Sequence, residues 1–186
     1  VPFPPGVAVV VLDTGTRRGL VDSAYNERRS RCEAAAEFFG TPALRDVTPG
    51  MFAQRAGGLD DVTRRRALHV ITENRRTLQA VEAMRRGEVA ALGALMDQSH
   101  KSLRDDYEVS SEALDAMVEA ARAHPACYGA RMTGAGFGGC AVAIIDASRA
   151  EDFVPSVAAD YEKKTGNTPA IYVCQATNGA EVVRGA

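Results

Sequence analysis

The residues best suited to chemistry are four glycines within the run RMTGAGFGGC, at Gly134, Gly136, Gly138 and Gly139. Glycine has no Cβ and tolerates positive φ, so successive backbone N–H groups can turn toward one point. Such a loop can approach a phosphate more closely than a loop that carries side chains. The run predicts either a phosphate-proximal loop or a tight turn that only lets two elements pack.

Two common nucleotide-binding motifs do not fit this loop. The glycines satisfy G-x-G-x-x-G, but a dinucleotide site needs a strand before the loop and a helix after it. Here a helical segment is expected before the loop, ending at Pro125, and a strand is expected at residues 140–146. A Walker A loop needs a Lys directly after its last glycine, and none follows here.

Other polar side chains offer weaker candidates. His69 is expected inside a long helix as a hydrogen-bonded interior residue, and His100 at a helix end, where it can meet free carbonyls. Asp105 and Asp106 have no third ligand at suitable spacing, so a solvated turn is favoured over a metal site. The arginine doublets, interrupted by glutamates, predict a charged solvent face rather than a phosphate track; they are Arg65–Arg66, Arg75–Arg76 and Arg85–Arg86.

Composition is that of an ordinary globular piece of protein. The 186 residues include 22 basic and 24 acidic side chains, and the net charge of −2 gives no attraction to nucleic acid or to an anionic membrane. No apolar run reaches the length of a membrane span. The four cysteines form no C-x-x-C motif, so we expect buried thiols in a reducing cytoplasm and no metal site.

Hydrophobic patterning and capping residues place these candidates on elements. Residues 7–13 are a continuous apolar run and predict a buried strand. A helix should end at Gly40, with Tyr25, Cys32, Ala36 and Phe39 on one face. A long helix is expected at 61–86, ended by Gly87, with an apolar stripe of Leu68, Ile71, Leu78 and Val81. Three more helices are expected: one that begins at 89, one capped by Ser110 or Ser111, and one at 149–164. Further strands are expected at 140–146, 170–176 and 181–183. Distant strands with helices between them indicate an α+β fold.

Four blocks of the sequence together resemble a known family. Residues 9–36 contain a strand, a D-T-G turn and S-x-Y-x-x-R-R-x-x-C-E; residues 64–84 contain H-V-x-x-E-N; residues 95–115 contain S-H-x-S-L-x-x-D-Y-x-V-S. These blocks resemble galactokinases, and the glycine loop is similar to the third motif of the GHMP small-molecule kinases to which galactokinases belong. The resemblance implies a ferredoxin-like C-terminal domain: a small, mostly antiparallel sheet with helices packed on one face.

The same resemblance implies which parts of the intact kinase lie outside this chain. We expect residues 1–186 to form a single domain, the C-terminal part of a longer kinase whose N-terminal domain is absent. The family's sugar-contacting signature and its P-x-x-x-G-L-S-S-S-A phosphate loop are not found in this sequence. The catalytic base and the metal ligands would come from that absent half, and this chain alone would be inert. An apolar face left by the missing domain could drive self-association.

The activity implied is transfer of the ATP γ-phosphoryl group, with Mg²⁺, to the anomeric hydroxyl of galactose. On residue patterning alone, Tyr25 is a core-packing aromatic; the resemblance makes it a sugar contact instead. A phosphate-proximal loop would comprise Thr133, Gly134, Ala135, Gly136, Phe137, Gly138 and Gly139. No catalytic side chain and no metal ligand is assigned to this chain.

Three alternatives stay open at the level of sequence. The same blocks would occur in a non-enzymatic sensor of galactose and ATP built on this scaffold. The chain could instead be a stand-alone ferredoxin-like binding module whose glycine loop is only a turn. Within the kinase class, another sugar such as N-acetylgalactosamine could be the substrate, since most contacts that separate sugars would lie in the missing half.

Overall fold

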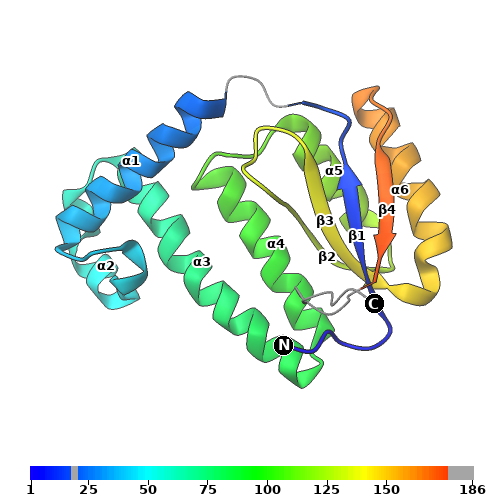
Figure 1. Cartoon of the computed structure of the whole chain (residues 1–186), viewed down its shortest axis with the longest axis horizontal. Helices are drawn as coiled ribbons and strands as arrows, with labels where there is room; N and C mark the ends of the chain where they lie inside the picture. Colours follow the sequence, from blue (N-terminus) through cyan, green and yellow to red (C-terminus); the bar gives the residue numbers. More distant parts are fainter. Residues whose placement is uncertain (18–20, 176–186) are drawn as a thin grey trace, which may run out of the picture.

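Four antiparallel strands form one sheet in the order β2-β3-β1-β4, and helices cover one of its faces (Figure 1). The structure is a computed structural model that describes residues 1–17 and 21–175. Its strands are β1 (Val7–Asp13), β2 (Cys127–Met132), β3 (Cys140–Asp146) and β4 (Ala170–Cys174). Its α-helices are α1 (Val21–Phe39), α2 (Pro49–Arg55), α3 (Asp61–Arg86), α4 (Val89–Asp105), α5 (Glu112–Ala123) and α6 (Ala150–Thr165).

The main core lies between the sheet and helices α5 and α6. Alternate residues of the central strand β1 point into it, so that Ala8, Val10 and Leu12 are buried. Phe153 and Tyr161 of α6 are fully buried against the same face. The opposite residues of β1 are half-buried, and this explains why the strand reads as a continuous apolar run rather than as an alternation.

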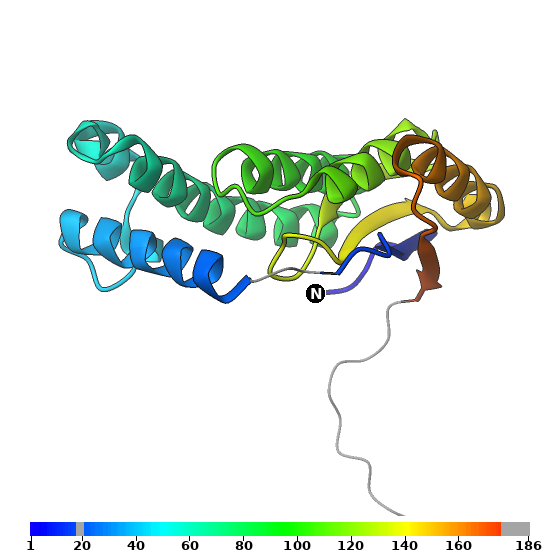
Figure 2. The ribbon, with the colours of Figure 1, turned by 90° about the horizontal axis from the view of Figure 1, so that it is seen from above.

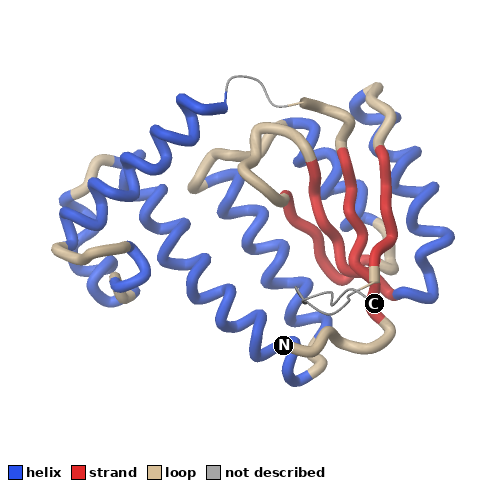
Figure 3. The backbone as a smooth tube through the Cα atoms, in the orientation of Figure 1, coloured by secondary structure: helices blue, strands red, loops and turns tan. Residues whose placement is uncertain are grey.

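The order of the sheet elements is that of a ferredoxin-like fold, as expected. Two β-α-β passes place β1 and β3 at the centre, with β2 and β4 at the edges (Figure 3). The first pass is long because it contains α1 to α4 before α5 reaches the sheet. The α+β prediction is confirmed. The short strand expected at 181–183 lies outside the described residues.

A second, helical lobe extends beyond the sheet (Figure 2). Its core is formed by α1, α3 and the segment between them, and includes Phe39, Leu44 and Ile71. The Asp60 carboxylate accepts hydrogen bonds from the first amides of α3, and Gly87 ends that helix with a φ of 67°. The long helix and its stop residue were both readable from the sequence, because N-caps and C-terminal glycines act locally.

Two elements differ from expectation. The helical segment before the glycine loop ends at Ala123, and strand β2 follows it, so the loop joins two antiparallel strands. Gly129 and Arg131 within β2 hide the strand pattern in the sequence. Helix α2 was also missed, although Thr48 caps it and Pro49 opens it. No helix follows the loop directly, so the dinucleotide motif is still excluded.

Two predicted helix faces were partly wrong. In α3, Ile71 is buried but Leu78 is 69% exposed. In α1, Phe39 and Ala36 are buried, whereas Tyr25 is 57% exposed. Tyr25 is the first member of its stripe and lies outside the core of the helical lobe, whereas Leu78 is exposed although Ala83, further along α3, is buried.

Helix α4 approaches β2 at backbone distance, and this contact generates a stability prediction. A Cβ at Gly93 would lie 1.8 Å from the Tyr128 carbonyl oxygen. We therefore expect Gly93→Ala to lower the free energy of unfolding by roughly 3 kcal/mol, since neither backbone can move away without disturbing the core. Gly50→Ala in α2 is the control, because its Cβ would meet only Thr48 Oγ1, at 3.8 Å.

The free energies of unfolding of both variants are measured by urea denaturation, with circular dichroism as the signal. Gly50→Ala should stay within about 1 kcal/mol of the unsubstituted protein. Equal stabilities of the two variants would contradict the close approach of α4 to β2.

Candidate functional site

The glycine loop is fixed to the end of β1. The Thr14 amide donates to the Gly139 carbonyl at 3.1 Å, and the Gly139 amide donates to the Thr16 carbonyl at 3.2 Å. The Thr14 hydroxyl also donates to the Gly139 carbonyl, at 2.7 Å, and this is the third bond between the two segments. Segments more than 120 residues apart in sequence are thereby held side by side.

An open depression of about 560 Å³ lies where these two segments meet. Its lining consists of Thr16, Arg17, Thr133, Gly134, Gly139 and Cys140. Hydroxyls and guanidiniums bind anions in proteins, and Thr16, Thr133 and Arg17 bring side chains of these kinds to the lining. The Thr133 and Gly139 amides are already bonded to the Cys140 and Thr16 carbonyls.

Only part of the predicted loop lines this depression. Thr133, Gly134 and Gly139 do, but the tip of the loop turns toward the segment between α4 and α5. There the Phe137 amide donates to the Val109 carbonyl oxygen at 2.7 Å. A Cβ at Gly136 would lie 2.1 Å from that oxygen. Glycine at 136 is thus required by a contact within the protein, whatever the loop binds.

Tyr25 lies in the second turn of α1 and does not belong to the core. With 57% of its surface exposed, it is among the most exposed large side chains of the described residues. Core packing, the interpretation from residue patterning alone, is therefore wrong. An exposed phenol can donate a hydrogen bond to a polar ligand.

The histidines have structural partners. His69 is buried, stacks on Tyr107 with ring centroids 4.5 Å apart, and its Nδ1 lies 3.0 Å from Ser102 Oγ. Burial lowers the pKa of His69 to about 4, so the ring is neutral at pH 7. His100 is also buried, and its Nδ1 accepts from the Met132 amide at 3.2 Å. The helix-end position expected for His100 was wrong, because α4 continues to Asp105.

The arginine doublets are not all on a solvent face. Arg66 is only 3% exposed. Its Nη1 donates to the Asp106 carbonyl at 2.5 Å, and its Nη2 pairs with Glu108 Oε2 at 2.7 Å. The expectation failed here because a carboxylate and a carbonyl from the α4–α5 connection compensate the buried charge.

The acidic pair does not form a metal site within the described residues. Asp105 Oδ1 accepts from Arg104 at 2.7 Å, and Asp106 Oδ2 accepts from the Ser102 hydroxyl at 2.7 Å. Residues 1–17 and 21–175 contain no group of three His, Cys, Asp or Glu side chains that could hold a metal ion. They also contain no helix long and apolar enough to cross a bilayer.

Sequence reasoning missed the residues that hold the loop in place, above all Arg28, Arg66 and Val109. Each of the three lies in one of the blocks quoted for the family resemblance: Arg28 in 9–36, Arg66 in 64–84 and Val109 in 95–115. Nothing in their spacing indicates contact, since Arg28 and its partner Tyr107 are 79 residues apart.

Comparison with known proteins identifies the domain. The family model for GHMP kinases C terminal matches residues 80–163. A galactokinase from Roseiflexus sp. (strain RS-1) is 47% identical over 184 residues, which cover 96% of this chain and 47% of the relative. The chain thus spans about half the length of this curated relative.

Solved structures agree with the sequence comparison. Lactococcus lactis galactokinase, crystallised with galactose, superposes with a TM-score of 0.87 at 34% identity, over 91% of this chain and 45% of that one. A mevalonate kinase from L. major in complex with R-mevalonate gives 0.60 at 21% identity, over 96% and 45%, and so shows a shared fold only. The chain belongs to the GHMP kinase family, as a C-terminal domain that resembles those of galactokinases.

Proposed function

We propose that this chain is the C-terminal half of a galactokinase that transfers the ATP γ-phosphoryl group to the anomeric hydroxyl of galactose, giving galactose 1-phosphate. The observation that carries the proposal is the 47% identity to a galactokinase over almost the whole chain. Phosphoryl transfer depends mainly on positioning and on stabilising charge. We propose that this half supplies one wall of the cleft, in a cytoplasmic enzyme.

The depression beside β1 suits the triphosphate part of this proposal. Thr133, Gly134 and Gly139 would border the phosphates, and Arg17 would offset their charge. Mg²⁺ would neutralise charge on the same phosphates. The described residues offer no cluster of three ligands for it, so its protein ligands are expected in the N-terminal half.

Tyr25 is proposed to contact the sugar. Its exposure leaves the hydroxyl available for a ligand, and α1 begins just after the segment that carries Thr16 and Arg17. Sugar and phosphate contacts would therefore come from consecutive stretches of chain.

The first prediction concerns the whole protein. These 186 residues alone should show no galactose-dependent ATP turnover, and the chain joined to an N-terminal half carrying the family's phosphate loop should show it. A coupled ADP-release assay measures this. Normal turnover by the chain alone would contradict the proposal. Galactose binding without turnover by the joined protein would favour the sensor, and absence of binding would favour the stand-alone module.

The second prediction concerns Tyr25. In the full-length protein, Tyr25→Phe should raise the galactose KM by about two- to tenfold, the loss of one neutral hydrogen bond. The ATP KM and the Tm should change little, because Tyr25 is outside the core. Tyr172→Phe is the matched control, since Tyr172 in β4 is equally exposed, at 57%. Equal effects of the two substitutions would remove Tyr25 from the sugar site.

The third prediction concerns the loop. Gly136→Ala would place a Cβ 2.1 Å from the Val109 carbonyl oxygen and push the loop away from its position. We expect kcat to fall by roughly a hundredfold, as for other small misplacements of positioning groups, with little change in the galactose KM.

Gly166→Ala controls for backbone strain in this experiment. Gly166 has a φ of 71°, comparable to 87° at Gly136, but a Cβ there would meet nothing within 4 Å. Similar kinetics for both alanine variants would show that the close approach at Gly136 has no part in activity.

A further inference from the structure

Two residues with unusual backbone conformation flank the contact between the glycine loop and the α4–α5 connection. Among the described residues, Glu108 (φ 52°) and Phe137 (φ 61°) are the non-glycine residues with positive φ. Such conformations are unfavourable for side-chain-bearing residues and persist only where the surroundings hold them. The hydrogen bond from the Phe137 amide to the Val109 carbonyl lies between them.

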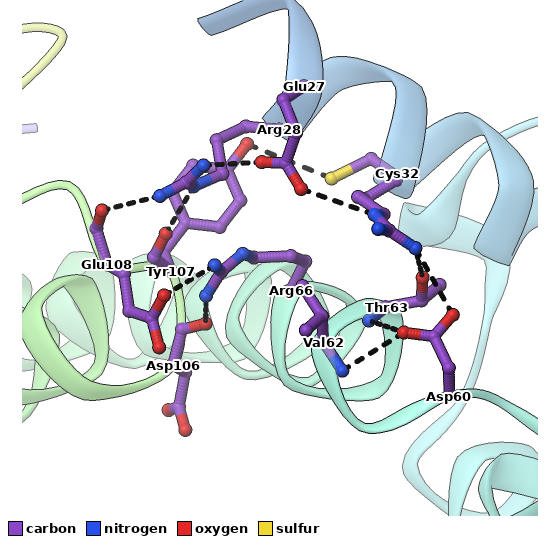
Figure 4. Close-up of polar contacts among 11 residues, drawn as sticks. Glu27, Arg28, Cys32, Asp60, Val62, Thr63, Arg66, Asp106, Tyr107 and Glu108 are labelled. Atoms are coloured by element: carbon purple, nitrogen blue, oxygen red, sulfur yellow. Dashed lines mark hydrogen bonds and ion pairs between the residues drawn. The ribbon is translucent and has the colours of Figure 1, made fainter. Parts of the chain in front are cut away.

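Arg28 of α1 is the side chain that holds this region from one side (Figure 4). Its Nε donates to the Tyr107 carbonyl at 2.7 Å, and its Nη2 donates to the Glu108 carbonyl at 2.7 Å. Its Nη1 pairs with Glu27. The guanidinium carbon also lies 5.8 Å from the centroid of the Phe137 ring. One guanidinium therefore contacts both the connection and the tip of the glycine loop.

Arg66 of α3 holds the connection from the other side. It donates to the Asp106 carbonyl. The Glu108 carboxylate forms ion pairs with Arg66 at 2.7 Å and with Arg65 at 2.6 Å. Each of the four successive carbonyls from 106 to 109 thus accepts a hydrogen bond from outside the connection. Such a segment cannot shift without losing several bonds at once.

We propose that Arg28 is a positioning residue, which fixes the tip of the glycine loop through the Tyr107–Val109 connection and ties it to the helix that carries Tyr25. Tyr25 precedes Arg28 by three residues on α1, so the helix proposed to meet the sugar is linked, through the connection and the Arg28–Phe137 contact, to the loop proposed to border the triphosphate. The kinetic part of this inference rests on the proposed function; the structural part does not.

The planar fork of arginine is needed for this role. Nε and Nη2 point at two successive carbonyls while Nη1 reaches Glu27. Lysine keeps the positive charge and most of the stem but has a single nitrogen, which cannot reproduce that arrangement. Arg28→Lys in the full-length protein is therefore the test, because it changes hydrogen-bond geometry while preserving charge.

Arg29→Lys is the matched control. Arg29 is the next residue of α1, its side chain is 69% exposed, and it pairs only with Glu33 among the contacts of the described residues. We expect Arg28→Lys to speed hydrogen exchange of the Phe137 amide by about tenfold or more, since charged hydrogen bonds that hold its acceptor are lost. The Val10 amide, at the centre of the sheet, should be unchanged, and Arg29→Lys should change neither.

The kinetic readout is separate from the exchange readout. Arg28→Lys should lower kcat about tenfold and raise the ATP KM, whereas Arg29→Lys should leave both unchanged. Equal acceleration of Phe137 and Val10 would mean that Arg28 stabilises the fold as a whole, and would overturn the inference; so would unchanged exchange at Phe137. An unsubstituted protein without galactose-dependent turnover would overturn the proposed function, and the exchange data would still decide the role of Arg28.

Discussion

The carbonyl of Val109 is the point on which the arrangement of sheet, helices and loop depends. It accepts from the Phe137 amide at 2.7 Å, and this distance is possible only because residue 136 has no side chain. A similar contact joins α4 to β2 through Gly93 and Gly129. Helix α4 and the connection that follows it are therefore set against β2 and the glycine loop by backbone-to-backbone approaches, which allow less adjustment than contacts between flexible side chains.

The same constraint explains the role of the charged side chains that α1 and α3 direct at the α4–α5 connection. Buried arginines rarely add stability, because desolvation offsets most of the attraction to their partners. Arg28 and Arg66 instead direct their nitrogens at backbone carbonyls of one short connection (Figure 4). What these bonds determine is the conformation of the connection, including the left-handed backbone at Glu108. The Arg66 guanidinium is buried and that of Arg28 is half-buried, and desolvating them costs energy. Their bonds therefore specify one geometry rather than a more stable core.

The sequence predicted those parts of the fold that depend on neighbours along the chain. Strand β1 and helix α3, with its stop at Gly87, follow from apolar runs and capping residues. Strand β2 was missed because its glycine serves a partner in α4, far away in sequence. Tyr25 and Leu78 were assigned to apolar faces, but periodicity along one helix does not show which of its residues another element covers. The glycine loop was visible in the sequence; its partners Val109 and Arg28 were not, because contact across such separations leaves no local pattern.

The glycines of the loop form one motif, but glycine is needed at different positions for different physical reasons. Gly134 and Gly139 line the open depression beside β1, where a ligand could approach their backbone. Gly136 is buried against Val109 and serves the architecture. Under the proposed function the two roles would be connected, because a backbone that must stabilise charge works best when it does not have to reorganise. A loop bonded at its base to β1 and at its tip to Val109 meets that condition before any ligand arrives.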